Sequence, residues 1–283
     1  MPRIAYVNGR YVPYGAAVVH IEDRGYQFAD GVYEVIPIDR SRLVDEEPHL
    51  DRLDYSLGEL RIEAPMARRA LKTVLREVIR RNGVEQGLVY MQVTRGVAPR
   101  EHKFPKLSHS ALVVTTKRLR PLPAEMLERG VAVITLPDIR WKRRDIKSIA
   151  LLPNVMAKQQ AAEQGAYEAW QLDEAGHVTE GASTNAWIVT QDGEIVTRPR
   201  SHDILSGITR MALLDLTVEG KLKLTERGFT LAELYAAAEA FLTGSSIYVV
   251  PVTQVDGRPI GNGKPGPVTR RLRELFTARL ERA

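Results

Sequence analysis

Apolar residues recur every three or four positions in two segments near the start of the chain. The segments are HLDRLDYSLGELRI, residues 49–62, and ARRALKTVLREVIRRNG, residues 67–83. In the second segment, one helical face collects the apolar residues Leu71, Val74, Leu75, Val78 and Ile79. Gly83 follows this face and is a typical C-terminal helix cap. We therefore expect two amphipathic helices, the second ending at Gly83.

Short β-prone runs predict strands in both halves of the chain. Asn8-Gly9 separates IAYV from RYVPY and predicts a hairpin, and Asp192-Gly193 predicts another within NAWIVTQDGEIVT. The remaining strand candidates cover residues 88–96, 110–116, 131–137 and 167–173.

Further helices are expected in the second half. One runs from about Pro153 to Gly165, with proline in its first turn and glycine at its end. TLAELYAAA begins with Thr230 and Glu233 at capping-box spacing, and VTRRLRELFTARL predicts an amphipathic C-terminal helix.

Strands and helices in both halves indicate an α+β, or mixed α/β, chain of two domains. The stretch KRLRPLPAEMLERG carries two prolines and little β character, so we place the boundary there. The expected domains are residues 1–118 and 131–283, joined by a linker over 119–130.

Composition narrows the class of protein. The chain has 283 residues, 44% of them hydrophobic, and a formal charge of +5 from 40 basic and 35 acidic residues. The basic residues are spread along the chain rather than gathered in a basic and aromatic block, which argues against nucleic acid as a partner, and an anionic small molecule fits the excess charge equally well. Absence of cysteine excludes disulfides, thiolate metal sites and cysteine nucleophiles, and it fits a reducing cytoplasm. With no signal-like start and no run of about 18 apolar residues, we expect a soluble, unexported protein.

Lys147 and Glu180 are ambiguous from their local sequence. Lys147 ends a basic run and precedes the apolar residues 149–152, so it is either a solvated surface charge or a lysine whose pKa an apolar pocket lowers to give a nucleophilic amine. Glu180 precedes a small polar turn and is either exposed or buried with a cationic partner. A protonated heterocyclic nitrogen would be one such partner.

Three stretches could bind an anion. SGITRMALLDL, residues 206–216, places glycine before a helical run, whose first N–H groups either hold a phosphate or simply begin a helix. Ser245 and Ser246 either bind phosphate or form a turn. Arg100 and His102 alternate in an extended segment and face either one anionic group or solvent. The spacings of a serine hydrolase triad, a P-loop and a zinc protease are absent, and no metal site is expected.

Six motifs together carry a family resemblance. They are EDRGYQFADGVYEVI (22–36), HLDRL (49–53), QVTRGVAPREHKFP (92–105), DIKS (145–148), VTEGASTN (178–185) and GITR (207–210). In this order they resemble the class IV aminotransferases, the fold type IV pyridoxal-phosphate enzymes, and most closely their D-amino-acid branch. The resemblance spans essentially the whole chain. It implies a smaller N-terminal α/β domain and a larger C-terminal β-rich domain, with the cofactor between them.

The resemblance also assigns roles to individual residues. Pyridoxal 5′-phosphate is the implied cofactor, and Lys147 is its Schiff-base lysine and the carrier of the substrate α-proton. Glu180 would pair with the protonated pyridine nitrogen. The implied phosphate ligands are Arg52, the backbone of Ile208 and Thr209, Ser245 and Ser246. The substrate α-carboxylate would be held by Tyr33, Arg100 and His102.

By the same resemblance, Arg100 and His102 come from the partner subunit of a homodimer whose active site is shared across the interface. The expected activity is cytoplasmic transfer of the amino group between D-amino acids and 2-oxo acids, such as D-alanine and 2-oxoglutarate, by a ping-pong route. Alternatives within the family are a branched-chain L-amino-acid aminotransferase, an (R)-amine transaminase and an aminodeoxychorismate lyase. Outside it, a basic nucleic-acid-binding protein using residues 143–147 is the remote alternative. The expected partners are small-molecule substrates and a second copy of the chain, with no nucleic acid and no membrane.

Overall fold

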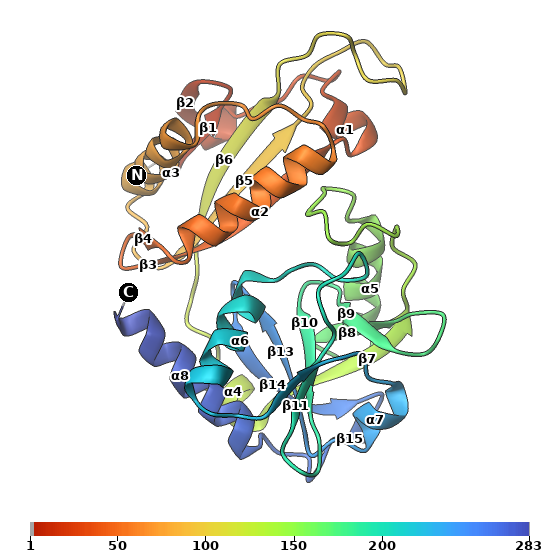
Figure 1. The fold of residues 1–283 in the computed structure, drawn as a ribbon. Coiled ribbons are helices and arrows are strands. Elements are labelled where there is room, and N and C mark those ends of the chain that lie inside the picture. Colours follow the sequence, from red (N-terminus) through yellow and green to blue (C-terminus); the bar gives the residue numbers. More distant parts are fainter. Residues whose placement is uncertain (1–2, 283) are drawn as a thin grey trace. The chain divides into compact units, whose positions relative to one another are not determined.

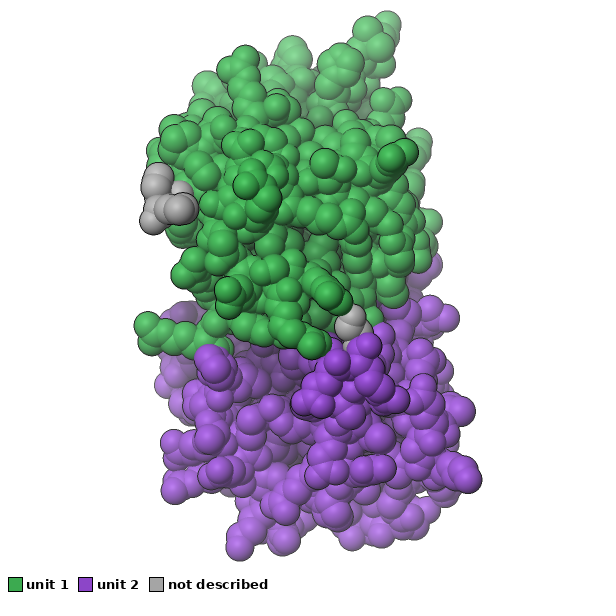
Figure 2. All heavy atoms as spheres, turned by 90° about the vertical axis from the view of Figure 1, so that its left-hand side faces the viewer, with its two compact units in different colours: residues 1–120, 146–150 green, residues 121–145, 151–283 purple. Residues whose placement is uncertain are grey.

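The computed structural model describes residues 3–282, and the chain divides into two compact units (Figures 1 and 2). Unit 1 contains residues up to Arg120 and the short segment 146–150. Unit 2 contains residues 121–145 and the chain from Leu151 onward. The main chain therefore leaves unit 2 after Asp145, contributes five residues to unit 1, and returns.

Unit 1 is built on an antiparallel sheet. Within residues 3–282 this sheet has six strands in the order β2-β1-β6-β5-β3-β4. Its strands are β1 (Ile4–Val7), β2 (Arg10–Pro13), β3 (Gly31–Asp39), β4 (Arg42–Leu43), β5 (Gly87–Thr94) and β6 (Ala111–Arg118). A 3-10 turn, η1 (Tyr14–Ala16), and a short helix, α1 (Arg24–Phe28), lie between β2 and β3.

One face of this sheet is covered by two helices (Figure 1). Helix α2 (Glu46–Glu59) packs against β3, and α3 (Arg68–Asn82) packs against β1 and β6. Because side chains alternate along a strand, Val32 and Ile36 of β3 and Met91 of β5 enter this core. The opposite face stays half-buried and carries Tyr33 and Tyr90.

The segment 146–150 runs beside β3. The Tyr33 N–H donates to the Lys147 carbonyl at 3.0 Å, and the Ile149 N–H donates to the Gly31 carbonyl at 3.1 Å. An antiparallel bridge pairs Val32 with Ser148. These bonds fix the backbone of Lys147 to the sheet of unit 1.

The described part of unit 2 forms a nine-stranded mixed sheet, in the order β12-β11-β10-β13-β14-β7-β8-β9 with β15 beside β14. Its strands are β7 (Val131–Pro137), β8 (Glu168–Leu172), β9 (Val178–Gly181), β10 (Asn185–Val189), β11 (Ile195–Thr197), β12 (Leu224–Glu226), β13 (Glu239–Gly244), β14 (Tyr248–Val255) and β15 (Arg258–Pro259). Pairs β7–β8, β7–β14 and β11–β12 are parallel.

Helices enclose the core of unit 2. They are α4 (Ala124–Arg129), α5 (Leu152–Glu163), α6 (Ile208–Glu219), α7 (Leu231–Tyr235) and α8 (Pro267–Arg282). Helices α6 and α8 pack together and against β13, around the buried rings of Trp187, Phe241 and Phe276. Among the residues described, no helix is long and apolar enough to cross a membrane.

Several elements agree with the sequence prediction. The Asn8-Gly9 and Asp192-Gly193 hairpins are present, and α3 ends at Gly83 in the left-handed conformation. The Thr230–Glu233 capping box starts α7. Each of these depends on local backbone chemistry or on a regular apolar period, so the sequence alone specifies it.

The boundary between the two units lies between Arg120 and Pro121, within the predicted linker over 119–130. Helix α4 occupies the expected linker 119–130, because Met126 and Leu127 pack on the core of unit 2. Lys147, which the prediction placed in the second domain, groups with unit 1 through its bonds to β3. A linker with two prolines therefore conceals a helix that begins immediately after Pro123.

Gly96, at the start of the loop that carries Arg100 and His102, is expected to be irreplaceable. Its φ is +93°, and a Cβ there would lie 1.9 Å from the His109 carbonyl oxygen. Gly193, with φ +81° and open space around it, is the matched control. Gly193→Ala should lose about 1–2 kcal/mol from left-handed strain alone, and Gly96→Ala should lose more because backbone must also move. Urea denaturation measures both, and equal losses would contradict this account.

Candidate active site

Lys147 lies against an aromatic side chain of β3. Its Nζ is 4.2 Å from the centre of the Tyr33 ring, its N–H donates to Ser56 Oγ at 3.2 Å, and its carbonyl accepts from Tyr33. The side chain is half-buried. The main chain is thus held at both polar groups, while the amine lies over the half-buried face of the sheet.

That face presents tyrosine hydroxyls rather than charges. The rings of Tyr33 and Tyr90 are 5.8 Å apart, and the Tyr90 hydroxyl donates to Gln92 Oε1 at 2.6 Å. Burial, with a smaller effect from Tyr33, raises the pKa of Tyr90 to about 12. Tyr90 is therefore neutral at physiological pH. It contributes a hydroxyl group, and no negative charge, to the face of the sheet on which Lys147 lies.

Arg52 lies on the other side of β3, in a buried charge cluster. Its Nε and Nη2 donate to the two carboxylate oxygens of Glu34 at 2.7 and 2.8 Å, and His49 Nδ1 lies 2.7 Å from Glu34 Oε2. Burial alone would raise the pKa of Glu34, but the Arg52 charge and these hydrogen bonds lower it to about 2. Burial lowers the pKa of His49. The predicted phosphate ligand is thus oriented by a carboxylate from the same strand as Tyr33.

Arg100 and His102 are exposed and share one aromatic neighbour. The Arg100 guanidinium lies 5.2 Å from the Phe28 ring centre, and the His102 and Phe28 rings are 5.4 Å apart. Buried Arg24 donates to the Glu101 carbonyl at 2.5 Å and bonds Asp30 through Nε. The loop backbone is therefore anchored while both predicted carboxylate-binding side chains remain open to a ligand.

Glu180 on β9 is buried within unit 2 and has several donors. Arg140 Nη1 donates to Oε1 at 2.5 Å, Asn185 Nδ2 to Oε2 at 3.0 Å, and the Leu205 N–H lies 3.1 Å from both oxygens. Burial raises the pKa of Glu180, and the Arg140 charge opposes that rise. Glu180 is therefore buried beside a cation that the chain itself supplies, Arg140, and its pairing with a ring nitrogen stays a prediction.

Asn185 connects the two segments of unit 2 that are predicted to bind phosphate. Helix α6 starts after Gly207 without a side-chain cap, so the first-turn N–H groups at Ile208 and Thr209 lack intrahelical acceptors. A Cβ at Gly207 would lie 2.0 Å from Asn185 Oδ1, so only glycine permits this approach. Asn185 is also the cross-strand partner of Thr243.

Ser245 and Ser246 form the turn between β13 and β14, just beyond Thr243. Glu180, the α6 start and this serine turn therefore belong to one region of unit 2. Its uncapped N–H groups and hydroxyls suit a phosphate, and its buried carboxylate suits a cationic ring, so these residues fit pyridoxal phosphate. No cluster that could hold a metal ion occurs among residues 3–282.

Sequence reasoning missed the residues that hold the predicted ones. Glu34 and His49 orient Arg52, while Arg140 and Asn185 bind Glu180. Glu34 had a detectable signal, since it is a lone charge within the apolar stretch GVYEVIPI. Arg140 lay in the charged run DIRWKRRD, where nothing distinguishes a buried arginine from a solvated one.

The fold and site define a two-unit α/β protein with a lysine fixed to a sheet edge and a helix, α6, that begins without a side-chain cap. Residues 31–255 match the family described as amino-transferase class IV. The chain belongs to this family, and its fold is that of the two-domain fold type IV enzymes.

Individual relatives resemble the chain along nearly its whole length. It is 42% identical over 265 residues to the D-alanine aminotransferase of Bacillus licheniformis, covering 94% of this chain and 93% of that protein. It is 38% identical over 276 residues to the D-alanine aminotransferase of Staphylococcus haemolyticus, covering 98% and 97%.

Solved structures show the same fold. The branched-chain amino acid aminotransferase of Escherichia coli has a TM-score of 0.91 at 26% identity, covering 98% of this chain and 94% of that chain. The branched-chain amino acid aminotransferase of T.th., solved with pyridoxamine 5′-phosphate, has a TM-score of 0.90 at 28% identity, covering 98% and 93%.

The buried Glu34 cluster should make unit 1 acid-sensitive. A glutamate titrates near 4.5 when unfolded and near 2 in this cluster, so its stabilisation is complete above pH 4.5 and is lost as the pH falls toward 2. Glu34→Gln should flatten that pH dependence, and it should cost about 3–5 kcal/mol at pH 7 by leaving Arg52 buried without its anion. Urea denaturation followed by circular dichroism at pH 7, 5 and 3 measures both effects.

Glu77 provides the control for this prediction. Its pKa is also lowered to about 2 by Arg80 and Arg81, but it lies half-buried at the surface of α3 beside these two exposed arginines. Glu77→Gln should change stability at pH 7 much less than Glu34→Gln, because solvent screens these surface pairs. Equal stability of the two variants at pH 7, or an acid slope in Glu34→Gln as steep as that of the unmodified protein, would contradict the stabilising role of Glu34.

Proposed function

We propose that the protein is a pyridoxal-phosphate-dependent transaminase that moves the amino group between D-amino acids and 2-oxo acids. The observation that carries this proposal is the placement of Lys147, whose backbone is bonded to β3 and whose amine lies over Tyr33. Full-length similarity to proteins named D-alanine aminotransferase supports the D-amino-acid branch. D-alanine and 2-oxoglutarate are the proposed substrate pair, used in a ping-pong reaction.

Each proposed cofactor ligand has a distinct role. Bound pyridoxal phosphate supplies an aldehyde that condenses with amines and a ring that withdraws electrons from the substrate α-carbon. Arg52, the N–H groups of Ile208 and Thr209, and the hydroxyls of Ser245 and Ser246 bind the phosphate. Glu180 receives the protonated ring nitrogen. Lys147 Nζ would hold the cofactor covalently and would move the α-proton as an acid–base group.

Substrate binding depends on the exposed loop of unit 1. Arg100 and His102 lie on Phe28 with their polar groups open, which suits capture of an α-carboxylate together with a Tyr33 hydroxyl. We propose that the loop serves the site of a second copy, which makes the active protein a homodimer. A cytoplasmic location is part of the same proposal and agrees with the absence of cysteine.

A second activity in the same family has a specific observation in its favour. Branched-chain amino acid aminotransferases share the fold at a TM-score of 0.91. An (R)-amine transaminase or aminodeoxychorismate lyase would use the same lysine and glutamate. The chirality of the product distinguishes a branched-chain L-amino-acid aminotransferase from the D-amino-acid activity. Steeply salt-dependent nucleic-acid binding by a colourless protein would instead favour the remote alternative outside the family.

Lys147→Ala should abolish turnover without unfolding the protein. Borohydride reduction of the cofactor-loaded protein should label Lys147, and the variant should take no covalent label and lose activity by orders of magnitude. Lys142→Ala is the matched control, because Lys142 is an exposed lysine of the same segment. Peptide mapping by mass spectrometry and transaminase assays provide the measurements. Near-normal activity in Lys147→Ala would refute the assignment.

Arg100→Ala should weaken the reaction of D-alanine much more than that of an amine without a carboxylate. Loss of a charged hydrogen bond of about 1.5–3 kcal/mol corresponds to roughly a 10- to 150-fold fall in kcat/KM. Lys103→Ala, an exposed cation of the same loop, should have little effect. Equal falls for both substrates would show that Arg100 does not bind the carboxylate.

A further inference from the structure

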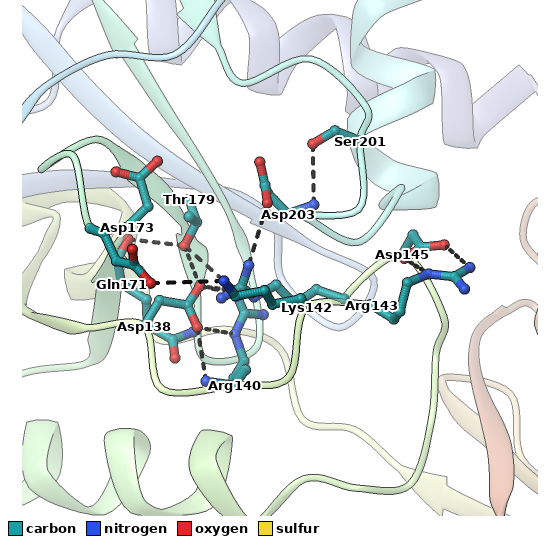
Figure 3. Close-up of polar contacts among 12 residues, drawn as sticks. Asp138, Arg140, Lys142, Arg143, Asp145, Gln171, Asp173, Thr179, Ser201 and Asp203 are labelled. Atoms are coloured by element: carbon teal, nitrogen blue, oxygen red, sulfur yellow. Dashed lines mark hydrogen bonds and ion pairs between the residues drawn. The ribbon is translucent and has the colours of Figure 1, made fainter.

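The partner of Glu180 is itself held by a second carboxylate. Arg140 Nη2 bonds Asp138 Oδ2 at 2.7 Å and its Nε bonds Asp138 Oδ1 at 3.0 Å, while Nη1 reaches Glu180. Thr179 Oγ1 lies 2.8 Å from Asp138 Oδ2 and fixes that carboxylate from β9 (Figure 3). The side chains of Asp138, Arg140 and Glu180 are all nearly inaccessible to solvent.

Ion pairs extend from Asp138 through a series of residues of alternating charge, here called the ladder. Arg144 lies 3.3 Å from Asp138 and 3.4 Å from Asp203, and Arg198 bonds both Asp203 and Asp173 at 2.8 Å. The ladder contains four carboxylates and three guanidiniums, so it carries one excess negative charge. Because Glu180 is the buried end of the ladder, that excess is what a cationic ligand would neutralise.

Other groups of unit 2 that face Glu180 do not replace Arg140. Asn185 and the Leu205 N–H donate hydrogen bonds without charge. Arg210 of α6 contributes a favourable field but pairs with Glu226 and the Arg198 carbonyl. Asp138 acts in the opposite direction, since its negative charge raises the pKa of Glu180. Arg140 is therefore the cation in direct contact with Glu180.

We propose that Arg140 is a positioning residue that keeps Glu180 ionised and oriented, and that Asp138 holds Arg140 in place for this task. Fully buried carboxyl groups favour the neutral form, and an adjacent guanidinium is the group that reverses this preference. An ionised Glu180 accepts a protonated ring nitrogen, whereas a neutral one would present a hydrogen-bond donor to it. The consequence for binding a ring nitrogen rests on the proposed function. The ionisation of Glu180 by Arg140 does not depend on that function.

The test is a pH titration of Glu180 in the protein free of cofactor. The Cδ resonance is followed by NMR in protein labelled with ¹³C-glutamate and assigned with Glu180→Gln. Arg140→Gln removes the charge but keeps a hydrogen-bond donor, and Arg140→Lys keeps the charge. Arg143→Gln is the control, because Arg143 lies in the same segment and pairs with Asp145. Trp141, Trp170 and Trp187 all belong to unit 2, so tryptophan fluorescence reports whether each variant is folded.

Glu180 should be ionised at pH 7 in the unmodified protein and in Arg140→Lys and Arg143→Gln. In Arg140→Gln its midpoint should rise by about 1–3 pH units, because an opposite charge in contact lowers a carboxyl pKa by that amount. An unmoved midpoint in folded Arg140→Gln, or a rise as large in Arg140→Lys, would overturn the proposal. If Arg140→Gln does not fold, a protonated Glu180 at pH 7 in the unmodified protein would still overturn it, and an ionised one supports it.

The same experiment separates this inference from the proposed function. The titration contains no pyridoxal phosphate, so it reads Glu180 whether or not the protein is a transaminase. Failure of the protein to bind pyridoxal phosphate would end the proposed function and leave the titration intact. If the Glu180 midpoint does not move in Arg140→Gln, but the protein binds the cofactor and turns over D-alanine, only the role of Arg140 is refuted.

Discussion

The pair of backbone hydrogen bonds between residues 146–150 and β3 is the constraint on which the candidate chemistry depends. They join a segment that lies between two parts of unit 2 in sequence to the sheet of unit 1. Without them, Lys147 would be a lysine in an irregular loop. With them, its Cα has a fixed place beside Tyr33, and the flexible part is confined to the side chain. Main-chain bonds suit this task because they specify direction as well as distance.

Two buried glutamates show how similar burial gives opposite electrostatics. Glu34 accepts two bonds from Arg52 and lies against His49, and its pKa falls to about 2. Glu180 shares its arginine with Asp138, and its pKa is raised. Glu34 is therefore fully compensated by its neighbours, whereas Glu180 is short of positive charge. Of the two, Glu180 is the carboxylate that gains most from an additional cation.

Sequence predicted the parts of this structure that local chemistry determines. Helix α3 follows from its apolar period and Gly83, and the Asn8-Gly9 hairpin follows from its turn. Strand β3 escaped prediction from periodicity because Glu34 and Pro37 interrupt its apolar pattern. The pairing of Ser148 with Val32 joins residues more than a hundred positions apart, and no local pattern encodes such a contact.

The segment from Asp138 to Ala150 is fastened in two different ways, and the difference matches what each half must do. Residues 138–145 are held by charged side chains, which set an electrostatic environment around Glu180. Residues 146–150 are held by backbone bonds, which leave the Lys147 side chain its rotational freedom. A group that must remain ionised needs a permanent charge beside it, whereas a group that must anchor a ligand and then carry a proton needs a fixed Cα and a mobile amine. One continuous stretch of chain supplies both conditions, so a substitution that loosens its charged half is expected to act on Glu180 before it acts on the position of Lys147.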